Sequence, residues 1–210
     1  MKRIALFGGT GKTGKEFLQK ALENEYHIKV LARSPEKVDT QSPHLEVIKG
    51  DVLNPATVNA TVAGTDIAVS LFGHVKGSPK WLQSDGTSNI LSAMLDHGVE
   101  KIISLSGGGL PFHKDEPKFA DKAIRLIMKV AVPKVLNDAI RHAEILKDSD
   151  RKWVIVRGPR LTEEPEKGNY RVGWVGVNAS TSIGRADLAD FILKQVEEDT
   201  YIYKMPFISY

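Results

Sequence analysis

The stretch Lys2-Arg-Ile-Ala-Leu-Phe-Gly-Gly-Thr-Gly-Lys-Thr-Gly-Lys15 holds the transition that decides the fold. Its apolar run, Ile4 to Phe7, has the length of one buried parallel strand and is too short for a helix. Gly8, Gly11 and Gly14 follow at a spacing of three residues, and apolar residues at helical spacing come after them. A strand, a glycine turn and a helix in this order are typical of a turn that holds a phosphate group at a helix N-terminus.

Each glycine has a separate physical role in such a turn. One lets the chain leave the strand with a positive φ, one lets a pyrophosphate approach the backbone, and one lets helix and strand pack closely. A P-loop would require Gly-x-x-x-x-Gly-Lys-[Ser/Thr]; Gly9 to Lys15 fits up to the lysine, but Glu16 then lacks the hydroxyl that binds magnesium. Ending that motif at Thr13 would need a glycine where Leu6 stands. A turn whose glycines serve packing alone also stays open, because the spacing is not the usual six-residue fingerprint.

The length and composition fit one α/β domain over residues 1–210, with at most a small appended lobe. No cysteine is present, which excludes disulfides and thiolate metal sites, and the six histidines are scattered, so we expect no metal site. We expect neither a signal peptide nor a membrane-spanning segment, and the formal charge of +3 is spread along the chain. We therefore expect a cytoplasmic monomer or small homo-oligomer with a small-molecule partner, and no nucleic-acid or membrane partner.

Apolar runs that alternate with helical patterns predict a parallel sheet with right-handed crossovers. Further strands are expected at residues 27–32, 45–49, 66–71, 99–106, 153–156, 170–177 and 200–205. Helices are expected after Asn54-Pro55 and over residues 85–95, 135–146 and 185–196. Residues 119–132 are apolar almost all round, so we expect a helix in the core there, with a wall over the active cleft as the alternative.

Arg33 and Ser34 follow the second expected strand, 19 residues past Gly14. In an NAD-binding fold an acidic residue usually stands near this point and holds the ribose 2′-hydroxyl. A guanidinium offers forked donors to a phosphate, whereas an acid would repel it. Arg33 and Ser34 therefore favour NADP(H), and the alternative is an arginine in a solvated turn.

Two other strand ends carry candidate ligand-binding residues. Asp51 follows the strand at residues 45–49, where it could accept a hydrogen bond from an adenine amino group or cap the helix near Asn54-Pro55. The residues leave these two interpretations evenly matched. Ser106 ends the strand at residues 99–106 and precedes three glycines. Because ligands of open parallel sheets bind outside the carboxyl ends of the strands, Ser106 is well placed to meet a cofactor.

Several stretches together are similar to one family. They are Gly8 to Gly14, Leu31 to Ser34, Gly50 to Val52, Asp85 to Leu91, Lys101 to Ser106, Val156 to Pro159 and Arg185 to Ala189. The chain resembles the atypical short-chain dehydrogenase/reductases, in particular the NAD(P)H-binding group that includes NmrA-like proteins and biliverdin reductase B, a flavin reductase. The resemblance covers nearly the whole chain. It implies a Rossmann-like, doubly wound, mostly parallel sheet with helices on both faces and a small C-terminal substrate lobe.

The resemblance also assigns the cofactor's parts to residues of this sequence. The pyrophosphate would lie on the glycine turn, with Gly8, Thr10, Gly11, Lys12, Thr13 and Gly14. The adenosine half would be held by Arg33 and Ser34 at the 2′-phosphate, Asp51 and Val52 at adenine, and Phe72 and Gly73 at the ribose. The nicotinamide half would be held by Ser106 and Gly107 at its ribose, and by Gly158, Pro159, Arg160 and Leu161 at the ring. Ser106 is the one candidate catalytic residue.

The sequence departs from the superfamily in one respect. The usual catalytic pair is Tyr-x-x-x-Lys on the helix after the fifth strand, yet no tyrosine occurs between Tyr26 and Tyr170. That helix offers only Asn137, Asp138, Arg141, His142 and Glu144. The biliverdin reductase B group also lacks the pair, so the resemblance implies an NADPH-dependent reductase of a conjugated acceptor such as a flavin or quinone. The alternative is an NADP(H)-sensing regulator of NmrA-like type with no turnover; a sugar-nucleotide epimerase would need the tyrosine and a larger lobe.

Overall fold

A computed structural model describes residues 1–210 as a three-layer α/β structure. Its central sheet has eight strands in the order β3-β2-β1-β4-β5-β6-β10-β8. Seven of them are parallel to their neighbours, and β8 is antiparallel to β10. The order reverses between β1 and β4, which is the switch point where nucleotides bind in doubly wound folds. The predicted Rossmann-like fold class is therefore confirmed.

The first six strands of the chain coincide with apolar runs predicted from the sequence. In the main sheet the strands are β1 (Arg3–Phe7), β2 (His27–Ala32), β3 (Leu45–Lys49), β4 (Ile67–Ser70), β5 (Lys101–Gly107), β6 (Lys152–Gly158), β8 (Arg171–Gly173) and β10 (Phe207–Ser209). A second, two-stranded parallel sheet pairs β7 (Arg160–Thr162) with β9 (Ser182–Gly184). The strand expected at residues 200–205 is wrong: those residues form a turn, and the strand begins only at Phe207.

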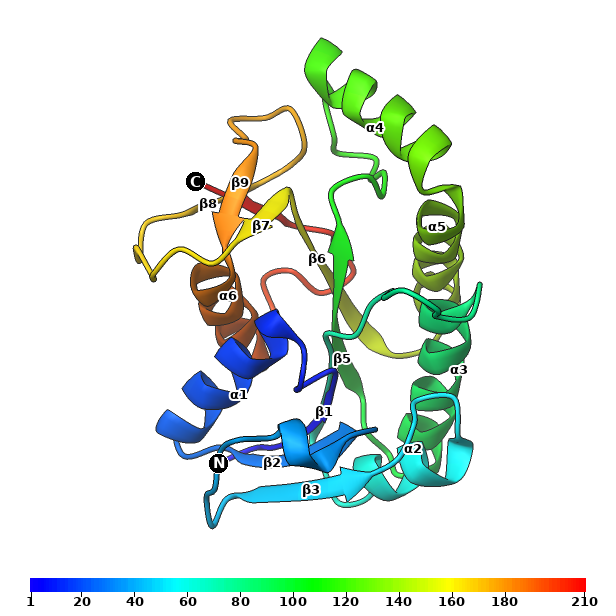
Figure 1. The fold of residues 1–210 in the computed structure, drawn as a ribbon, viewed down its shortest axis with the longest axis vertical. Helices are drawn as coiled ribbons and strands as arrows, with labels where there is room; N and C mark the ends of the chain where they lie inside the picture. Colours follow the sequence, from blue (N-terminus) through cyan, green and yellow to red (C-terminus); the bar gives the residue numbers. More distant parts are fainter.

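Six helices surround the sheet. They are α1 (Lys12–Glu23), α2 (Pro55–Val62), α3 (Leu82–Asp96), α4 (Phe119–Ala131), α5 (Pro133–Lys147) and α6 (Arg185–Glu197), with a short 3₁₀ turn at Pro35–Lys37. Figure 1 shows α1 and α6 on one face of the sheet, and α2, α3 and α5 on the other. Each face has its own apolar core, one built around Phe17 and Phe191 and the other around Ile90 and Leu146.

The helix α4 does not belong to either core. None of its residues is buried, and it extends away from the body after packing against the start of α5 (Figure 1). The expectation that residues 119–132 form part of the core is therefore wrong. The sequence suggested core because its apolar residues outnumber its charged ones, but in the structure they lie on the outward side.

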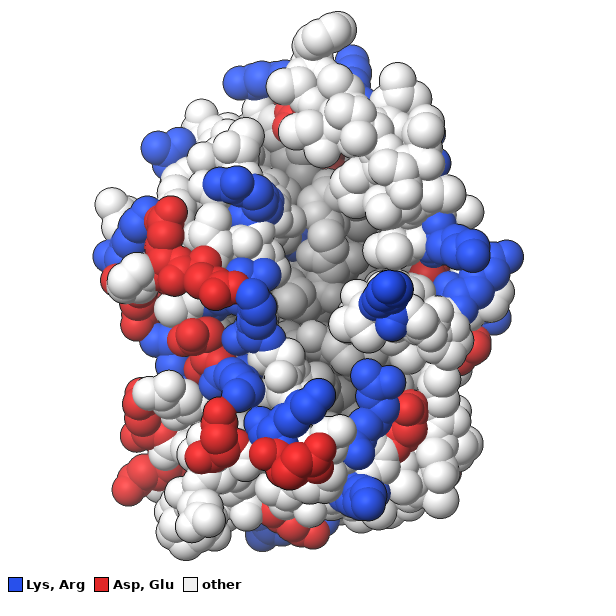
Figure 2. Space-filling model, viewed as in Figure 1, with Lys and Arg blue, Asp and Glu red and all other residues white.

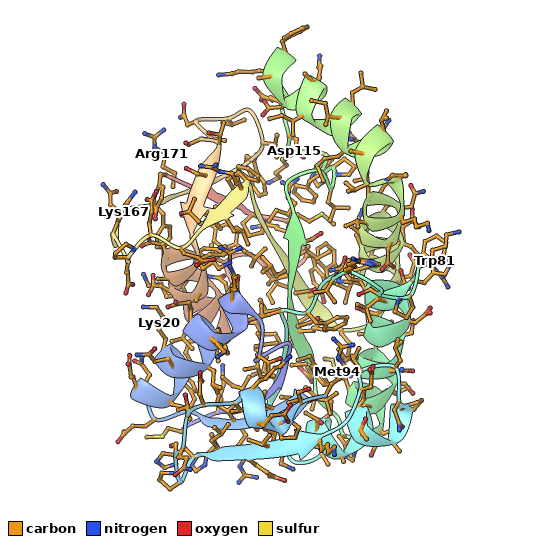
Figure 3. All side chains as sticks on the ribbon, in the orientation of Figure 1. Lys20, Trp81, Met94, Asp115, Lys167 and Arg171 are labelled. Carbon is orange, nitrogen blue, oxygen red and sulfur yellow. The ribbon has the colours of Figure 1, made fainter.

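A buried ion pair fixes the loop that leads to α4. The guanidinium of Arg157, fully buried on β6, donates to both carboxylate oxygens of Asp115 at 2.7 and 2.8 Å. It also donates to the carbonyl oxygens of Leu110 and Met205, so each of its three nitrogens has a hydrogen-bond partner. Figure 3 labels Asp115 below α4. The pair thus ties the loop after β5 to the end of β6, and α4 projects from a fixed base.

Candidate cofactor-binding site

The glycine turn has three glycines with three different constraints. Gly8 has φ of +89°, which L side chains rarely adopt, and an added Cβ would lie 2.5 Å from the backbone nitrogen of Phe72. An added Cβ at Gly14 would lie 2.1 Å from the carbonyl oxygen of Gly8, so this glycine allows the helix to pack on the strand. Gly11 has ordinary backbone angles, φ −75° and ψ 162°, and its missing Cβ would meet only the Gly8 carbonyl oxygen, at 3.3 Å. The fold has no comparable need for glycine at position 11.

The first turn of α1 offers free donors at this place. Gly11 is its N-cap, no side chain caps the helix, and no acidic residue lies in the first turn. The first N–H groups of a helix have no intrahelical partner, and the helix dipole favours an anion beside them. Lys12 points its ammonium to the carboxylate of Glu163 in the loop after β7, and this contact lowers the pKa of Glu163. The turn therefore fits a pyrophosphate, with the Lys12–Glu163 pair at its outer rim.

A cavity of about 270 Å³ opens next to the turn, at the carboxyl ends of β1, β2 and β4. Its lining residues include eight of the predicted cofactor residues: Gly8, Thr10, Gly11, Arg33, Asp51, Val52, Phe72 and Gly73. Leu31, Lys37, Leu71, Val75 and Leu82 complete its wall, together with Phe7 and Gly50. Lys12, Thr13, Gly14 and Ser34 do not line it; Thr13 and Gly14 lie buried beneath the turn. Its partly apolar wall and its place suit the adenosine half of a dinucleotide.

The apolar wall of this cavity is held by α3. A Cβ at Gly86 would lie 2.8 Å from the ring of Phe72 and 3.0 Å from Val52, so glycine makes room for both side chains. The side-chain amide of Asn89 donates to the carbonyl oxygen of Val52 at 3.0 Å. Both residues belong to the stretch Asp85 to Leu91, whose role could not be derived from the sequence. Their function here is to fix the shape of the cavity wall.

Two cations stand at the open side of the cavity. Arg33 at the end of β2 and Lys37 in the 3₁₀ turn are both exposed, and neither makes an ion pair. Lys37 was not among the residues predicted to bind the cofactor, although its place four residues after Arg33 could have indicated it. Figure 2 shows the central hollow of the molecule with several blue side chains around its rim. These charges suit a polyanionic ligand.

Asp51 makes a local hydrogen bond. Its Oδ1 accepts from the backbone N–H of Leu53 at 2.9 Å, whereas α2 is capped by Asn54, which accepts from the N–H of Ala56 at 3.0 Å. The interpretation of Asp51 as the helix cap is therefore wrong. The other carboxylate oxygen of Asp51 has no hydrogen bond within the protein, and the residue lines the cavity.

The second group of predicted residues lies at the ends of β5 and β6. Ser106 pairs with Arg157 and Gly107 with Gly158 in the register of these strands. Ser106 is only 7% exposed, and its buried Oγ has no hydrogen-bond partner. A buried hydroxyl without a partner is rare and calls for a ligand group or water. Its place at the carboxyl end of β5, together with the open turn at Gly11, fits a dinucleotide laid across the switch point.

The residues after β6 lead into the small second sheet. Pro159 is half-buried, Arg160 is exposed without an ion pair, and Leu161 packs with Gly158 and Ile183. The lobe that β7 and β9 form is held by Asp187 at the start of α6, which is fully buried. Its carboxylate accepts from the backbone N–H groups of residues 167 and 168 and from the hydroxyl of Tyr210. The stretch Arg185 to Ala189 therefore stabilises the lobe through Asp187, a role that was not predicted from the sequence.

No acid-base pair replaces Tyr-x-x-x-Lys on α5. Asp138 and His142 are four residues apart on its inner side, and both are buried. Asp138 accepts from the Ser84 hydroxyl, from two backbone N–H groups at the start of α3, and interacts with Nε2 of His74 at 2.7 Å. Burial alone would raise the pKa of Asp138, but these hydrogen bonds outweigh it and the pKa is lowered. Asp138 is thus an ionised anchor between α3, α5 and the loop after β4.

His142 is neutral under ordinary conditions. Its Nε2 lies 2.9 Å from the hydroxyl of Ser104, and burial lowers its pKa to about 4 even though the charge of Asp138 acts in the opposite direction. A neutral, buried imidazole has no mobile proton to give near pH 7. The structure also holds no cluster of three or more histidine, aspartate or glutamate side chains arranged for a metal ion. None of its helices has the length and apolar composition needed to cross a bilayer.

The chain also matches a family of known nucleotide-binding proteins, as this site would suggest. The model of the NAD(P)H-binding family matches residues 8–199, which include the glycine turn and both strand-end groups. The chain therefore belongs to the NAD(P)H-binding family, and the resemblance seen in the sequence is confirmed.

The relatives by sequence are distant. An uncharacterized chloroplastic protein of Arabidopsis thaliana is 25% identical over 97% of this chain and 75% of its own length. The uncharacterized protein YwnB of Bacillus subtilis is 24% identical over 93% of this chain and 92% of its own. An uncharacterized protein of Mycobacterium tuberculosis is 28% identical, but this chain spans only 12% of its length.

Solved structures share the fold. A short-chain dehydrogenase/reductase of Veillonella parvula, in complex with NADP, gives a TM-score of 0.78 at 18% identity, over 100% of this chain and 94% of that chain. ChuY of Escherichia coli O157:H7, described as an anaerobillin reductase, gives a TM-score of 0.77 at 17% identity, over 100% and 97%. At these identities the likeness shows a common architecture.

Proposed function

We propose that this protein is an NADPH-dependent reductase that transfers hydride to a conjugated acceptor, such as a flavin or a quinone. Two features near the switch point carry the proposal. Gly11 has no side chain that would block a phosphate from the backbone, and the buried hydroxyl of Ser106 has no hydrogen-bond partner within the protein. Membership of the NAD(P)H-binding family supports the cofactor class. NADPH supplies the hydride when it is bound.

The preference for NADPH over NADH is supported by charge. Arg33 and Lys37 share the rim of the adenosine cavity, and neither is neutralised by a carboxylate. Cations without a partner gain most from a phosphate, because no existing ion pair has to be broken. The carboxylate that would hold a ribose 2′-hydroxyl is missing at the tip of β2.

A conjugated acceptor is supported by the absence, on α5, of an acidic side chain that could donate a proton to the acceptor. Asp138 is held ionised by its hydrogen bonds and His142 is held neutral by burial, so α5 presents no group that protonates a carbonyl oxygen. A conjugated acceptor spreads the developing charge over its ring system, and solvent can then deliver the proton. The protein's own residues bind and orient: the turn holds phosphate, Ser106 donates a hydrogen bond, and the lobe around β7 borders the acceptor side.

The acceptor preference is tested by following NADPH oxidation spectroscopically. FMN and a soluble quinone are the conjugated acceptors, and a simple ketone and an aldehyde are the comparison. We expect measurable oxidation with the first pair and negligible oxidation with the second. Rapid reduction of the ketone would overturn the proposed chemistry. Tight NADPH binding with no oxidation by any acceptor would instead favour the NADP(H)-sensing regulator, which the missing Tyr-x-x-x-Lys pair fits equally well.

A further inference from the structure

The helix α4 presents its apolar side to solvent. Six of the eleven exposed large hydrophobic side chains of the protein lie within residues 119–132. Phe119 is 87% exposed, Val130 78%, and Leu126 and Ile127 each 63%. The half-buried residues on the side toward the body are mixed in polarity: Asp121, Ala123, Arg125 and Met128. A surface helix normally has the reverse arrangement, so the outward face of α4 lacks the apolar partner that such a face requires.

The same segment is strongly basic. Residues 118–134 contain five cationic side chains, Lys118, Lys122, Arg125, Lys129 and Lys134, and one carboxylate, Asp121. Their net charge of +4 exceeds the +3 of the whole chain, so the remaining residues carry a net charge of −1. On the helix, Lys122 and Lys129 are exposed and border Leu126. In Figure 2 the surface over α4, at the top of the molecule, is largely uncharged and has blue side chains at its edge.

Against the expectation from the sequence that the protein has no membrane partner, we propose that α4 is an interfacial helix that binds the protein to an anionic lipid surface. An exposed apolar face bordered by lysine is the combination that binds in the headgroup region of anionic bilayers. The helix has 13 residues, about 20 Å, and is too short to cross a hydrocarbon core of about 30 Å. It therefore lies in the plane of the surface, with its apolar side chains among the acyl chains and its lysines at the phosphate level.

The positive charge of residues 118–134 favours an anionic lipid surface over a second copy of the chain as the partner of α4. A symmetric dimer through α4 would place the same basic helix against itself. Two segments of net charge +4 would then face each other across the contact, which disfavours association. An anionic lipid surface offers acyl chains to the apolar face of α4 and negatively charged headgroups to its lysines. The rigid base that Arg157 and Asp115 give to the preceding loop holds the helix outside the body, where it can meet a flat surface.

The test uses the whole protein without cofactor, so its result is independent of the proposed function. Vesicles of phosphatidylcholine mixed with phosphatidylglycerol are compared with vesicles of phosphatidylcholine alone in co-sedimentation. We expect binding to the anionic vesicles that weakens as salt is raised. Ile127→Gln with Val130→Gln, and separately Lys122→Glu with Lys129→Glu, should each weaken binding at least about tenfold. The matched controls are Val47→Gln with Leu95→Gln, and Lys49→Glu with Lys147→Glu, which change exposed residues outside residues 118–134 and should bind like the wild type.

The absence of cysteine allows a direct measurement of insertion. Ile127→Cys carries an environment-sensitive dye, and Lys147→Cys carries the same dye as the control. A blue shift at position 127 alone, on anionic vesicles alone, is the expected result. Three outcomes overturn the proposal: no binding at low salt; equal binding by both pairs of α4 variants and their controls; or a concentration-dependent dimer, seen by ultracentrifugation, that Ile127→Gln with Val130→Gln abolishes in the absence of lipid binding.

Discussion

Substitutions at single residues of the glycine turn distinguish a glycine that the fold requires from a glycine that the bound cofactor requires. We expect Gly11→Val to fold normally and to lose cofactor binding, because its backbone angles suit valine while the side chain fills the space of the phosphate. Gly14→Val is the contrast: its Cβ would meet the Gly8 carbonyl oxygen at 2.1 Å, so the protein itself should be destabilised. Circular dichroism and NADPH titration of both variants distinguish the two effects. Retained binding by a folded Gly11→Val protein would place the phosphate elsewhere.

Arg33 should set the choice between the two nicotinamide cofactors. We expect NADPH to bind at least about tenfold more tightly than NADH, or roughly 1.4 kcal/mol, through charged hydrogen bonds at the rim of the cavity. Arg33→Asp should remove or reverse this preference, and Lys37→Ala should reduce it, because Lys37 lines the same rim. Titration of both cofactors against the three proteins measures the effect. Equal affinities in the wild type would contradict the assignment of NADP(H).

Ser106 should contribute one hydrogen bond and no proton transfer. Ser106→Ala removes a buried hydroxyl that has no partner within the protein, so its effect on folding should be small. We expect the rate of acceptor reduction to fall by roughly tenfold or less, the value of one positioning hydrogen bond. Steady-state rates with NADPH and FMN give the comparison. A thousandfold loss would show that Ser106 is an acid or part of a proton relay.

Among the secondary-structure elements, β6 and the loop after β5 depend on one buried charge pair. Asp115→Asn should destabilise the protein by about 3–5 kcal/mol, because it leaves the guanidinium of Arg157 buried with only neutral partners. The double variant Asp115→Leu with Arg157→Met removes both charges and should recover part of the loss, but only part, because the backbone groups that the two side chains bind lose their partners. Urea unfolding of the single and double variants measures both values. Equal stability of the wild type and Asp115→Asn would show that the pair does not anchor this loop.

The contact between α5 and β5 should make stability depend on pH. His142 has a pKa lowered by burial to about 4, against 6.5 for the unfolded chain, so the unfolded state binds more protons within this window. The free energy of unfolding should therefore fall as the pH falls from 6.5 toward 4, by up to about 3 kcal/mol from this residue. His142→Gln cannot titrate and should show a shallower decline. An unchanged pH profile in that variant would assign the dependence to other groups.

For the molecule as a whole, the sequence predicted the architecture well. Periodic apolar runs and the glycine turn identified the parallel strands and their helices, because a strand buried on both faces leaves a clear signature. The residues expected to hold the cofactor stay a prediction, although eight of them meet in one cavity. Lys37, Gly86 and Asp187 were missed because their roles depend on distant neighbours: a shared cavity, the ring of Phe72 and the backbone of residues 167 and 168. The exposure of the apolar face of α4 was not predicted, because the composition of a helix does not show which of its sides faces the rest of the protein.

The place of β10 in the sheet has a consequence for the order of folding. This strand lies between β6 and β8, yet it is formed by residues 207–209, far along the chain from β6. During synthesis, β6 therefore emerges with an open edge, and its unpaired N–H and C=O groups form a template for another chain until residues 203–207 pair with it. Partly folded chains should associate through this edge, so refolding yield should fall with concentration far more steeply in a variant lacking residues 203–210, which carry the backbone groups that pair with β6, than in the full chain. The strands β1 to β4 have all of their sheet neighbours within β1 to β5, so this half can become compact while β6 still lacks its partner on one side.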